Sequence, residues 1–293
     1  MPTRARKAAP APERLRVRKT YKLYIGGAFP RSESARSYPV TGAGGTLLAH
    51  AAQASRKDVR DAVVAARKAA PRWAGATAYN RGQILYRVAE MLDGRREQFA
   101  AEVAAAEGVD GLSTVDAVID RWVWYAGWAD KYAQVVGSSN PVSGPYFNFS
   151  LPEPTGVVGV LAPQDSSLLG LVSVVAPVIA TGSTAVVVAS EERPLPAVSL
   201  AEVLATSDLP GGVVNLLTGR VAELAPWLAS HRDVNAMDLT GADAGARTAL
   251  QQAAADNVKR VYIPGDVDWA ADPDTSRLAA FVETKTVWHP IGV

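Results

Sequence analysis

Residues 157–188, VVGVLAPQDSSLLGLVSVVAPVIATGSTAVVV, decide the fold of this chain. Val157–Leu161 and Ala185–Val188 are short runs rich in β-branched residues, which is typical of strands. Such runs are nearly continuously apolar, as strands of a sheet that is covered on both faces must be. An apolar stretch of helical length separates them. The segment therefore predicts a buried strand, a buried helix and a second buried strand.

The uncharged stretch 166–190 is also long enough to suggest a membrane helix. Pro177, Gly182, Ser183 and Thr184 interrupt it near its middle. A helix, a turn and a strand fit these breaks better than one continuous span does. We therefore expect no membrane segment.

The same alternation continues toward the C-terminus, where further β-branched runs are separated by helical stretches: Val213–Leu217, Ala236–Leu239 and Val261–Ile263. Strands that alternate with helices predict a parallel sheet with right-handed crossovers. The predicted fold class is thus α/β, with a doubly wound parallel sheet.

The segment before this sheet, residues 55–135, has helical periodicity. A capping-box pattern at Ser55 and Asp58 predicts a helix to about Lys68, and Tyr21–Phe29 predicts a small hairpin around Gly26–Gly27. Five aromatic residues form a cluster within this segment: Trp122, Trp124, Tyr125, Trp128 and Tyr132. Their helical spacing favours packing in the core or at an interface over a platform for stacking ligands.

Two segments outside the alternating region predict a small β arm. Ser138–Pro154 combines several prolines with the aromatic residues Tyr146, Phe147 and Phe149, as in a hairpin excursion. Arg277–Trp288 ends in charges that alternate with β-branched and aromatic residues, which indicates a strand. Such a strand can add to the edge of another sheet.

The N-terminal residues 1–20 carry seven basic residues and one acidic residue. Pro2, Pro10 and Pro12 interrupt any amphipathic helix, so we expect a disordered tail, with an electrostatic arm or a targeting peptide as the alternative. The whole chain has a net charge of only +1, which argues against nucleic acid as a partner. We expect a cytoplasmic protein.

The composition also limits the chemistry. The chain has no cysteine, which excludes thiol nucleophiles and thiolate metal sites. Its three histidines, His50, His231 and His289, have no neighbours at ligand spacing. We therefore predict no metal site.

Several motifs resemble the NAD(P)-dependent aldehyde dehydrogenase superfamily, in the order and spacing of that family: WYAGWADK at 124–131, EPTGVVGV at 153–160, APVIATGST at 176–184, LPGGVVN at 209–215 and LTG at 239–241. The resemblance covers residues 20–265. It implies a Rossmann-like coenzyme domain, and it assigns Ser138–Pro154 and the final strand to the family's oligomerisation arm.

The resemblance also implies that the catalytic machinery is missing. Between Ile263 and Arg277 the family inserts a domain that bears its cysteine nucleophile, whereas this chain has a short connection. The family's general base falls on Pro264. Its Pro-Trp-Asn motif becomes Pro163-Gln164-Asp165, and an ionised Asp165 cannot donate to an oxyanion. We therefore predict no catalytic residue in this chain.

The cofactor site that the resemblance implies is degenerate. Ser190 and Glu191 match residues around the adenosine ribose, but Val188 replaces the family's lysine. Losing a charged hydrogen bond costs about 1.5–3 kcal/mol. Arg220, Val221 and Ala225 place side chains where adenine needs room.

The pyrophosphate turn of the family corresponds to Thr240 and Gly241–Gly245, with Asp243 near a helix N-terminus that should receive phosphate. Asp243 could cap that helix instead. We favour the structural interpretation, a tight strand-to-helix turn whose glycines are required by the backbone, over a functional dinucleotide site. The expected cofactor is accordingly none, or weakly bound NAD(P).

These inferences predict a coenzyme-binding-like domain at 21–137 and 155–270, with an oligomerisation arm at 138–154 and 271–293. The favoured function is that of a pseudoenzyme subunit that assembles with a full-length aldehyde dehydrogenase, in a structural or regulatory role. The partner is either such a subunit, in a hetero-oligomer, or a second copy through the C-terminal strand. Removal of the catalytic domain should also uncover apolar surface that demands a partner.

Two other functions remain open. One is an NAD(P)-dependent aldehyde oxidoreductase that acts only as part of a hetero-oligomer. The other is a structural shell or filament component, which the edge strand and the basic tail suggest.

Overall fold

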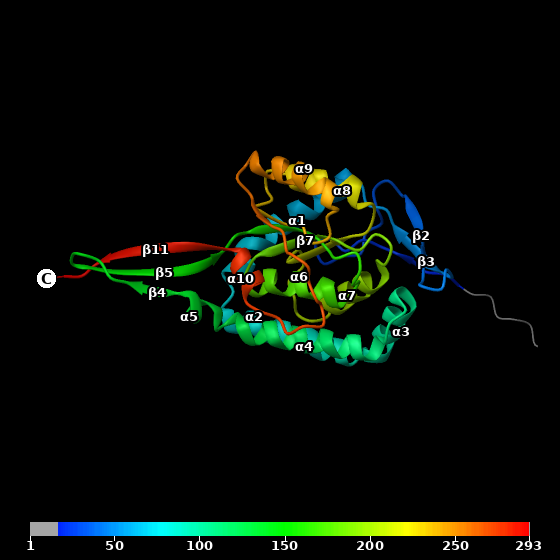
Figure 1. Cartoon of the computed structure of the whole chain (residues 1–293), viewed down its shortest axis with the longest axis horizontal. Coiled ribbons are helices and arrows are strands. Elements are labelled where there is room, and N and C mark those ends of the chain that lie inside the picture. Colours follow the sequence, from blue (N-terminus) through cyan, green and yellow to red (C-terminus); the bar gives the residue numbers. More distant parts are fainter. Residues whose placement is uncertain (1–16, 293) are drawn as a thin grey trace, which may run out of the picture.

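A five-stranded parallel sheet forms the centre of the molecule (Figure 1). The computed structural model describes residues 17–292, so the predicted tail 1–20 lies outside this range except for its last four residues. The strands have the order β10-β9-β6-β7-β8 and the following bounds: β6 Val157–Leu161, β7 Thr184–Val188, β8 Val214–Leu217, β9 Ala236–Asp238 and β10 Arg260–Tyr262. All the residues of β6 and β7 are buried, as their apolar sequences predict.

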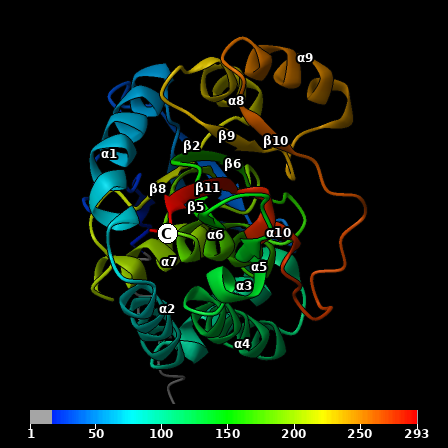
Figure 2. The same cartoon turned by 90° about the vertical axis from the view of Figure 1, so that its left-hand side faces the viewer.

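Helices cover both faces of this sheet (Figure 2). One face carries α1 Arg56–Ala74, α8 Val221–Ser230 and α9 Ala244–Ala255; the other carries α6 Leu169–Ala180 and α7 Leu195–Ala205. A further layer packs on α6 and α7 and consists of α2 Ala78–Asp93, α3 Arg96–Glu107 and α4 Gly111–Ala129. The doubly wound α/β prediction is confirmed.

The aromatic cluster of α4 belongs to the core. Trp122 is fully buried and Tyr125 is 2% exposed, while the rings of Trp124 and Trp128 lie 5.6 Å apart. The packing interpretation of these residues is therefore confirmed. No helix in residues 17–292 has the length and apolarity needed to cross a membrane.

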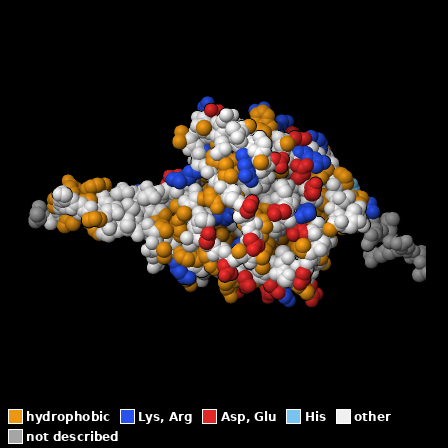
Figure 3. Space-filling model, in the orientation of Figure 1, with side chains coloured by type: hydrophobic (Ala, Val, Ile, Leu, Met, Phe, Trp, Pro, Cys, Tyr) orange, Lys and Arg blue, Asp and Glu red, His pale blue; other side chains and the backbone are white. Residues whose placement is uncertain are grey.

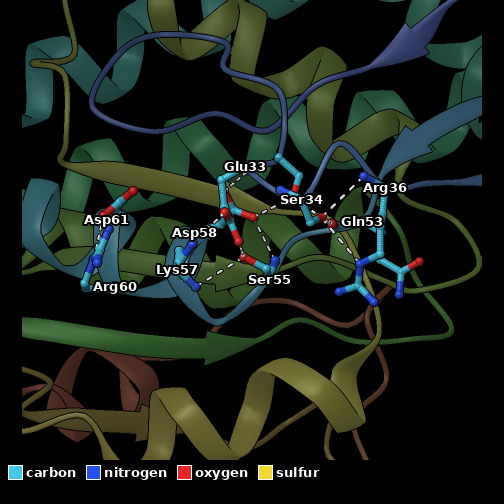
Figure 4. Close-up of polar contacts among 10 residues, drawn as sticks. Glu33, Ser34, Arg36, Gln53, Ser55, Lys57, Asp58, Arg60 and Asp61 are labelled. Carbon is cyan, nitrogen blue, oxygen red and sulfur yellow. Dashed lines mark hydrogen bonds and ion pairs between the residues drawn. The ribbon is translucent and has the colours of Figure 1, made fainter.

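Helix α1 begins at the predicted capping box (Figure 4). The Ser55 hydroxyl accepts from Lys57 N, and the buried Asp58 carboxylate accepts from Ser55 N at 2.7 Å. Asp58 also accepts from the Ser32 hydroxyl at 2.7 Å, which ties the preceding loop to the helix. The predicted end at Lys68 is wrong, because buried side chains continue the apolar stripe to Trp73 and the helix ends at Ala74.

The N-terminal segment forms a small separate sheet with the order β1-β3-β2, in which β1 spans Thr20–Tyr21, β2 Ser37–Thr41 and β3 Leu47–Ala52. The predicted hairpin around Gly26–Gly27 is reduced to a tight turn that Ile25 and Ala28 close by two backbone hydrogen bonds. Both glycines have positive φ, as such a turn requires.

A three-stranded antiparallel sheet, which we call the arm, projects from the body (Figure 1). It consists of β4 Ser138–Asn140, β5 Tyr146–Pro154 and β11 Val282–Pro290, in the order β11-β5-β4. Short helix α5, Tyr132–Val136, leads into it. The strand predicted at the end of Arg277–Trp288 is confirmed as part of β11, and the short helix α10, Ser276–Ala280, precedes it, with Leu278 and Phe281 buried in the core of the body.

Replacement of Ser55 by alanine should lower the free energy of unfolding by about 0.5–2 kcal/mol, because it removes the N-cap acceptor of α1. Chemical denaturation measures this change. The control is Ser143→Ala, at an exposed turn position in the arm. Equal stability of the two variants would contradict the role of the cap.

Candidate functional site

The carboxyl ends of β6 and β9 mark the place where a doubly wound sheet usually binds ligands. The chain leaves β6 toward the face that carries α6, and it leaves β9 toward the face that carries α9. Ligands of such sheets bind in the crevice at this switch point. The residues predicted from the sequence lie in the loops that follow β6, β7 and β9.

The turn after β9 closes onto the end of β6. Gly241 N donates to Leu161 O at 2.8 Å. A Cβ atom at position 241 would lie 1.9 Å from Ala162 O, so the backbones touch and only glycine fits. This contact supports the interpretation of the turn as one kept for backbone reasons.

Gly245 and Asp243 lie away from this contact. Gly245 is exposed at the start of α9, and a Cβ atom there would meet no atom within 4 Å. Asp243 is the N-cap residue of α9, but its side chain makes no capping hydrogen bond. The capping role suggested for Asp243 is therefore wrong, and its carboxylate stays in solvent.

Each oxygen of the Glu191 carboxylate accepts a hydrogen bond from within the chain. It accepts from Arg220 Nη1 at 2.6 Å and from Val221 N at 3.0 Å, at the start of α8. The bond to Glu191 raises the pKa of Arg220. Beside this pair opens a hollow of ≈ 320 Å³ whose lining includes Tyr38, Gly42 and Arg193.

Ser190 and Gln164 join the loops after β6 and β7. The buried Ser190 hydroxyl donates to Gln164 O at 3.3 Å, and Glu191 N donates to Gln164 Oε1 at 2.9 Å. Gln164 Nε2 in turn donates to Ala162 O at 2.7 Å. The amide therefore bridges two loops of its own chain, and neighbouring Asp165 is exposed.

Thr240 belongs to a buried ion pair that sequence reasoning missed. Asp238, at the end of β9, is 0% exposed and lies 2.7 Å from Arg277 Nη1. The Thr240 hydroxyl donates to Asp238 and accepts from Arg277 Nη2 at 3.2 Å. Burial raises the pKa of the Asp238 carboxyl, and the charge of Arg277 opposes that rise. In the sequence, the one indication of this pair was an aspartate at the end of the apolar strand β9.

The connection 264–275 is held against the body by a second buried arginine. Arg121, on α4, donates to Trp269 O at 3.0 Å, to Ala271 O at 2.9 Å and to the Ser173 hydroxyl at 2.6 Å. Burial lowers the pKa of Arg121. The Arg277 guanidinium also lies 5.6 Å from the Trp269 ring centre, so both buried arginines contact the connection.

The expected uncovered apolar surface is not found at this edge. Among the described loops that follow the strands of the sheet, Val267 is the one large hydrophobic residue that is exposed, at 38%. The polar contacts of Arg121 and Arg277 instead hold the connection in place. The arm carries several exposed large hydrophobic residues: Tyr146, Phe147, Leu151 and Trp288.

In the sequence analysis, three positions of this chain match catalytic positions of the resembled family: Gln164, Asp165 and Pro264. Gln164 has the contacts described above, the backbone oxygen of Asp165 accepts from Arg193 Nη1 at 2.9 Å, and Pro264, which follows β10, has no ionisable side chain. Residues 17–292 also contain no group of three histidine, aspartate or glutamate residues that could hold a metal ion.

Residues 31–264 match the family model described as "Aldehyde dehydrogenase family". The chain belongs to the aldehyde dehydrogenase family. Human "Aldehyde dehydrogenase, mitochondrial" is 30% identical over 288 residues, which cover 92% of this chain and 55% of that protein. "Aldehyde dehydrogenase family 2 member B4, mitochondrial" from Arabidopsis thaliana is 33% identical over 83% of this chain and 46% of that protein.

Solved structures agree with this membership. An NAD+ complex of aldehyde dehydrogenase from Bacillus cereus superposes with a TM-score of 0.78 at 26% identity, over 84% of this chain and 50% of that one. A putative aldehyde dehydrogenase from Burkholderia cenocepacia gives a TM-score of 0.79 at 30% identity, over 83% and 50% of the two chains. This chain thus spans about half the length of the relatives it matches.

Replacement of Arg277 by methionine should lower the free energy of unfolding by about 3–5 kcal/mol, because it leaves Asp238 buried without its counterion. The matched control is Lys285→Met, which breaks the exposed ion pair with Glu153 and should cost less than about 1 kcal/mol. Denaturant unfolding of both variants measures the difference. Similar costs would show that the buried pair contributes no more than a surface pair.

Proposed function

We propose that this chain is a non-catalytic member of the aldehyde dehydrogenase family that assembles with a complete aldehyde dehydrogenase subunit, in a structural or regulatory role. The observation that carries the proposal is that the retained polar groups are already bonded within the chain. Glu191 is bound to Arg220 and Val221, and Thr240 is bound to Asp238 and Arg277.

The side chains available for chemistry support the same proposal. Covalent oxidation of an aldehyde through a thiol needs a nucleophile, a base and an oxyanion donor within mutual reach. The chain has no cysteine. Gln164 bonds to its own loops, and Asp165 presents an acceptor where a donor is needed.

The arm supports assembly. Figure 3 shows hydrophobic side chains gathered on its projecting end, where Phe147 is 48% exposed and Trp288 59% exposed. Apolar patches of this kind mark interaction sites, because burial of such side chains on a partner is favourable. We place this assembly in the cytoplasm, a location that fractionation of the producing cells would test.

A second candidate is an oxidoreductase that completes its active site with another chain. It is favoured by the retention of Glu191 and of the turn Thr240-Gly241 at the switch point of the sheet. The bonded state of Glu191 and the closed contact between Gly241 and Ala162 weigh against it.

Titration of the purified chain with NAD+ and with NADP+ should give no heat of binding at micromolar concentrations, because an incoming ribose must displace Arg220 from Glu191. Isothermal calorimetry measures this, with a complete aldehyde dehydrogenase as the positive control. Micromolar affinity, or aldehyde-dependent NADH formation by the chain alone, would favour the oxidoreductase instead.

Affinity purification of the tagged chain from cells that produce it should recover a complete aldehyde dehydrogenase, identified by mass spectrometry. The variant Phe147→Asp should recover at least about tenfold less, because it places a charge in the apolar end of the arm. Val64→Asp, at a 56% exposed position on α1, is the matched control. Recovery that is equal for both variants, or that lacks any family member, would refute the proposal.

A further inference from the structure

Helices α1 and α8 lie side by side on one face of the sheet (Figure 2), and a hollow of ≈ 240 Å³ opens between them. Six residues line it: Arg56, Val59, Arg60, Trp227, Ser230 and His231. None of these residues is acidic, and three of them are basic. The hollow shares no lining residue with the one beside Glu191, so it is a separate feature of the surface.

Stacking, rather than an acidic partner, holds the Arg56 side chain. Its guanidinium carbon lies 4.1 Å from the centre of the Trp227 ring. The ion pairs described for these first turns of α1 belong to Lys57 and Arg60, and Arg56 has none within residues 17–292. A guanidinium that stacks on an aromatic ring still presents the N–H donors in its own plane, in a fork that matches a carboxylate. The stack therefore positions donors at the rim of the hollow that no described residue uses.

Arg60 and His231 add donors to the same rim. Arg60 pairs with the neighbouring Asp61 through Nε at 2.8 Å and Nη2 at 2.7 Å, which leaves Nη1 without a described partner. His231 Nδ1 accepts from Asp233 N at 3.2 Å, so the neutral ring carries its proton on Nε2. The hollow thus combines donors from three side chains with a lining that holds no carboxylate, which is the electrostatic setting of an anion site.

The hollow also offers apolar and aromatic surface. Val59 is 1% exposed, and Trp227 is 42% exposed, so part of the indole ring is in contact with water. Burial of this ring under an apolar ligand is favourable. A cavity of about 150 Å³ admits a benzene molecule. A volume of ≈ 240 Å³ therefore admits one ring with a charged substituent and is too small for a dinucleotide.

We infer that this hollow binds a small carboxylate that carries one planar apolar ring. The ring packs against Val59 and Trp227, and the carboxylate accepts hydrogen bonds from Arg56, Arg60 and His231. A free phosphate ion would satisfy the same donors, but it would leave the Trp227 ring in water and gain nothing from burial. The inference is independent of the function proposed above, because none of these residues lies in the arm or in the loops of the candidate site.

Titration of the full chain with benzoate, followed by NMR of the imidazole resonances, tests the inference, because the chain has only three histidines. The His231 resonances, assigned with the variant His231→Asn, should shift with a dissociation constant of about 1 mM or lower. Those of His50 and His289, which lie outside the hollow, should stay unchanged. Burial lowers the pKa of His231 in the free chain, and a bound carboxylate should raise it. Unmoved His231 resonances would overturn the inference.

Three further probes separate the ring from the charge in the same titration. Acetate keeps the carboxylate without the ring, benzyl alcohol keeps the ring without the charge, and inorganic phosphate is an oxyanion without an apolar part. Each should bind at least about tenfold more weakly than benzoate, because each forms only part of the contacts. Equal affinity for inorganic phosphate would show a general anion site and would overturn the inference.

A matched pair of variants tests the stacked arginine. Arg56→Gln removes the guanidinium from the rim and should raise the dissociation constant for benzoate at least about tenfold. Lys57→Gln removes the same charge from the same turn of α1, but Lys57 pairs with Glu33 at 3.0 Å, apart from Arg60 (Figure 4). It should bind benzoate as the wild type does. Equal affinity of the two variants would refute the inference.

Discussion

The buried ion pair between Asp238 and Arg277 connects the two parts of this molecule. Asp238 ends β9 in the central sheet, and Arg277 lies in α10, directly before β11. Removal of these charges from water carries a penalty of several kcal/mol per ion, which their contact and the bonds to Thr240 offset. The position of α10, and with it the alignment of β11 on β5, therefore depends on this pair.

At the same edge of the sheet, two residues that the sequence analysis matched to a cofactor site form contacts within the chain. Glu191 and Thr240 are retained, but each is bonded to an arginine that the chain itself supplies. The Arg220 guanidinium also lies 5.2 Å from the ring centre of Tyr38. These bonds connect the loop after β7 to the start of α8 and the turn after β9 to α10.

The sequence predicted the parts of this fold that depend on short-range patterns. The apolar runs of β6 and β7 and the capping box at Ser55 lie where the patterns place them. The errors arose where tertiary contacts override local preference. Lys68 does not end α1, since the apolar stripe continues to Trp73. The helix α10 before the last strand was not predicted, because it depends on the burial of Leu278 and Phe281 in the core.

The candidate site was less predictable than the fold. The closeness of Gly241 to Ala162 agrees with a turn kept for backbone reasons. The partners of Glu191 and Thr240 could not be foreseen, because Arg220 and Arg277 lie 29 and 37 residues away from them and look like ordinary surface charges. The prediction for Asp243 relied on local sequence alone. Its position suits a cap, but its side chain makes no hydrogen bond to the helix N-terminus.

The short connection between β10 and α10 has a consequence for how the chain folds. Asp238 and Arg277 are 39 residues apart, and the entropy lost on closing a loop grows with its length. The last strand can therefore dock soon after β9 and β10 form, without waiting for an intervening domain. Docking of α10 also brings β11 to β5, whose paired residues lie 128–144 residues apart in the chain, so the buried ion pair replaces part of the long loop closure that the arm would otherwise need.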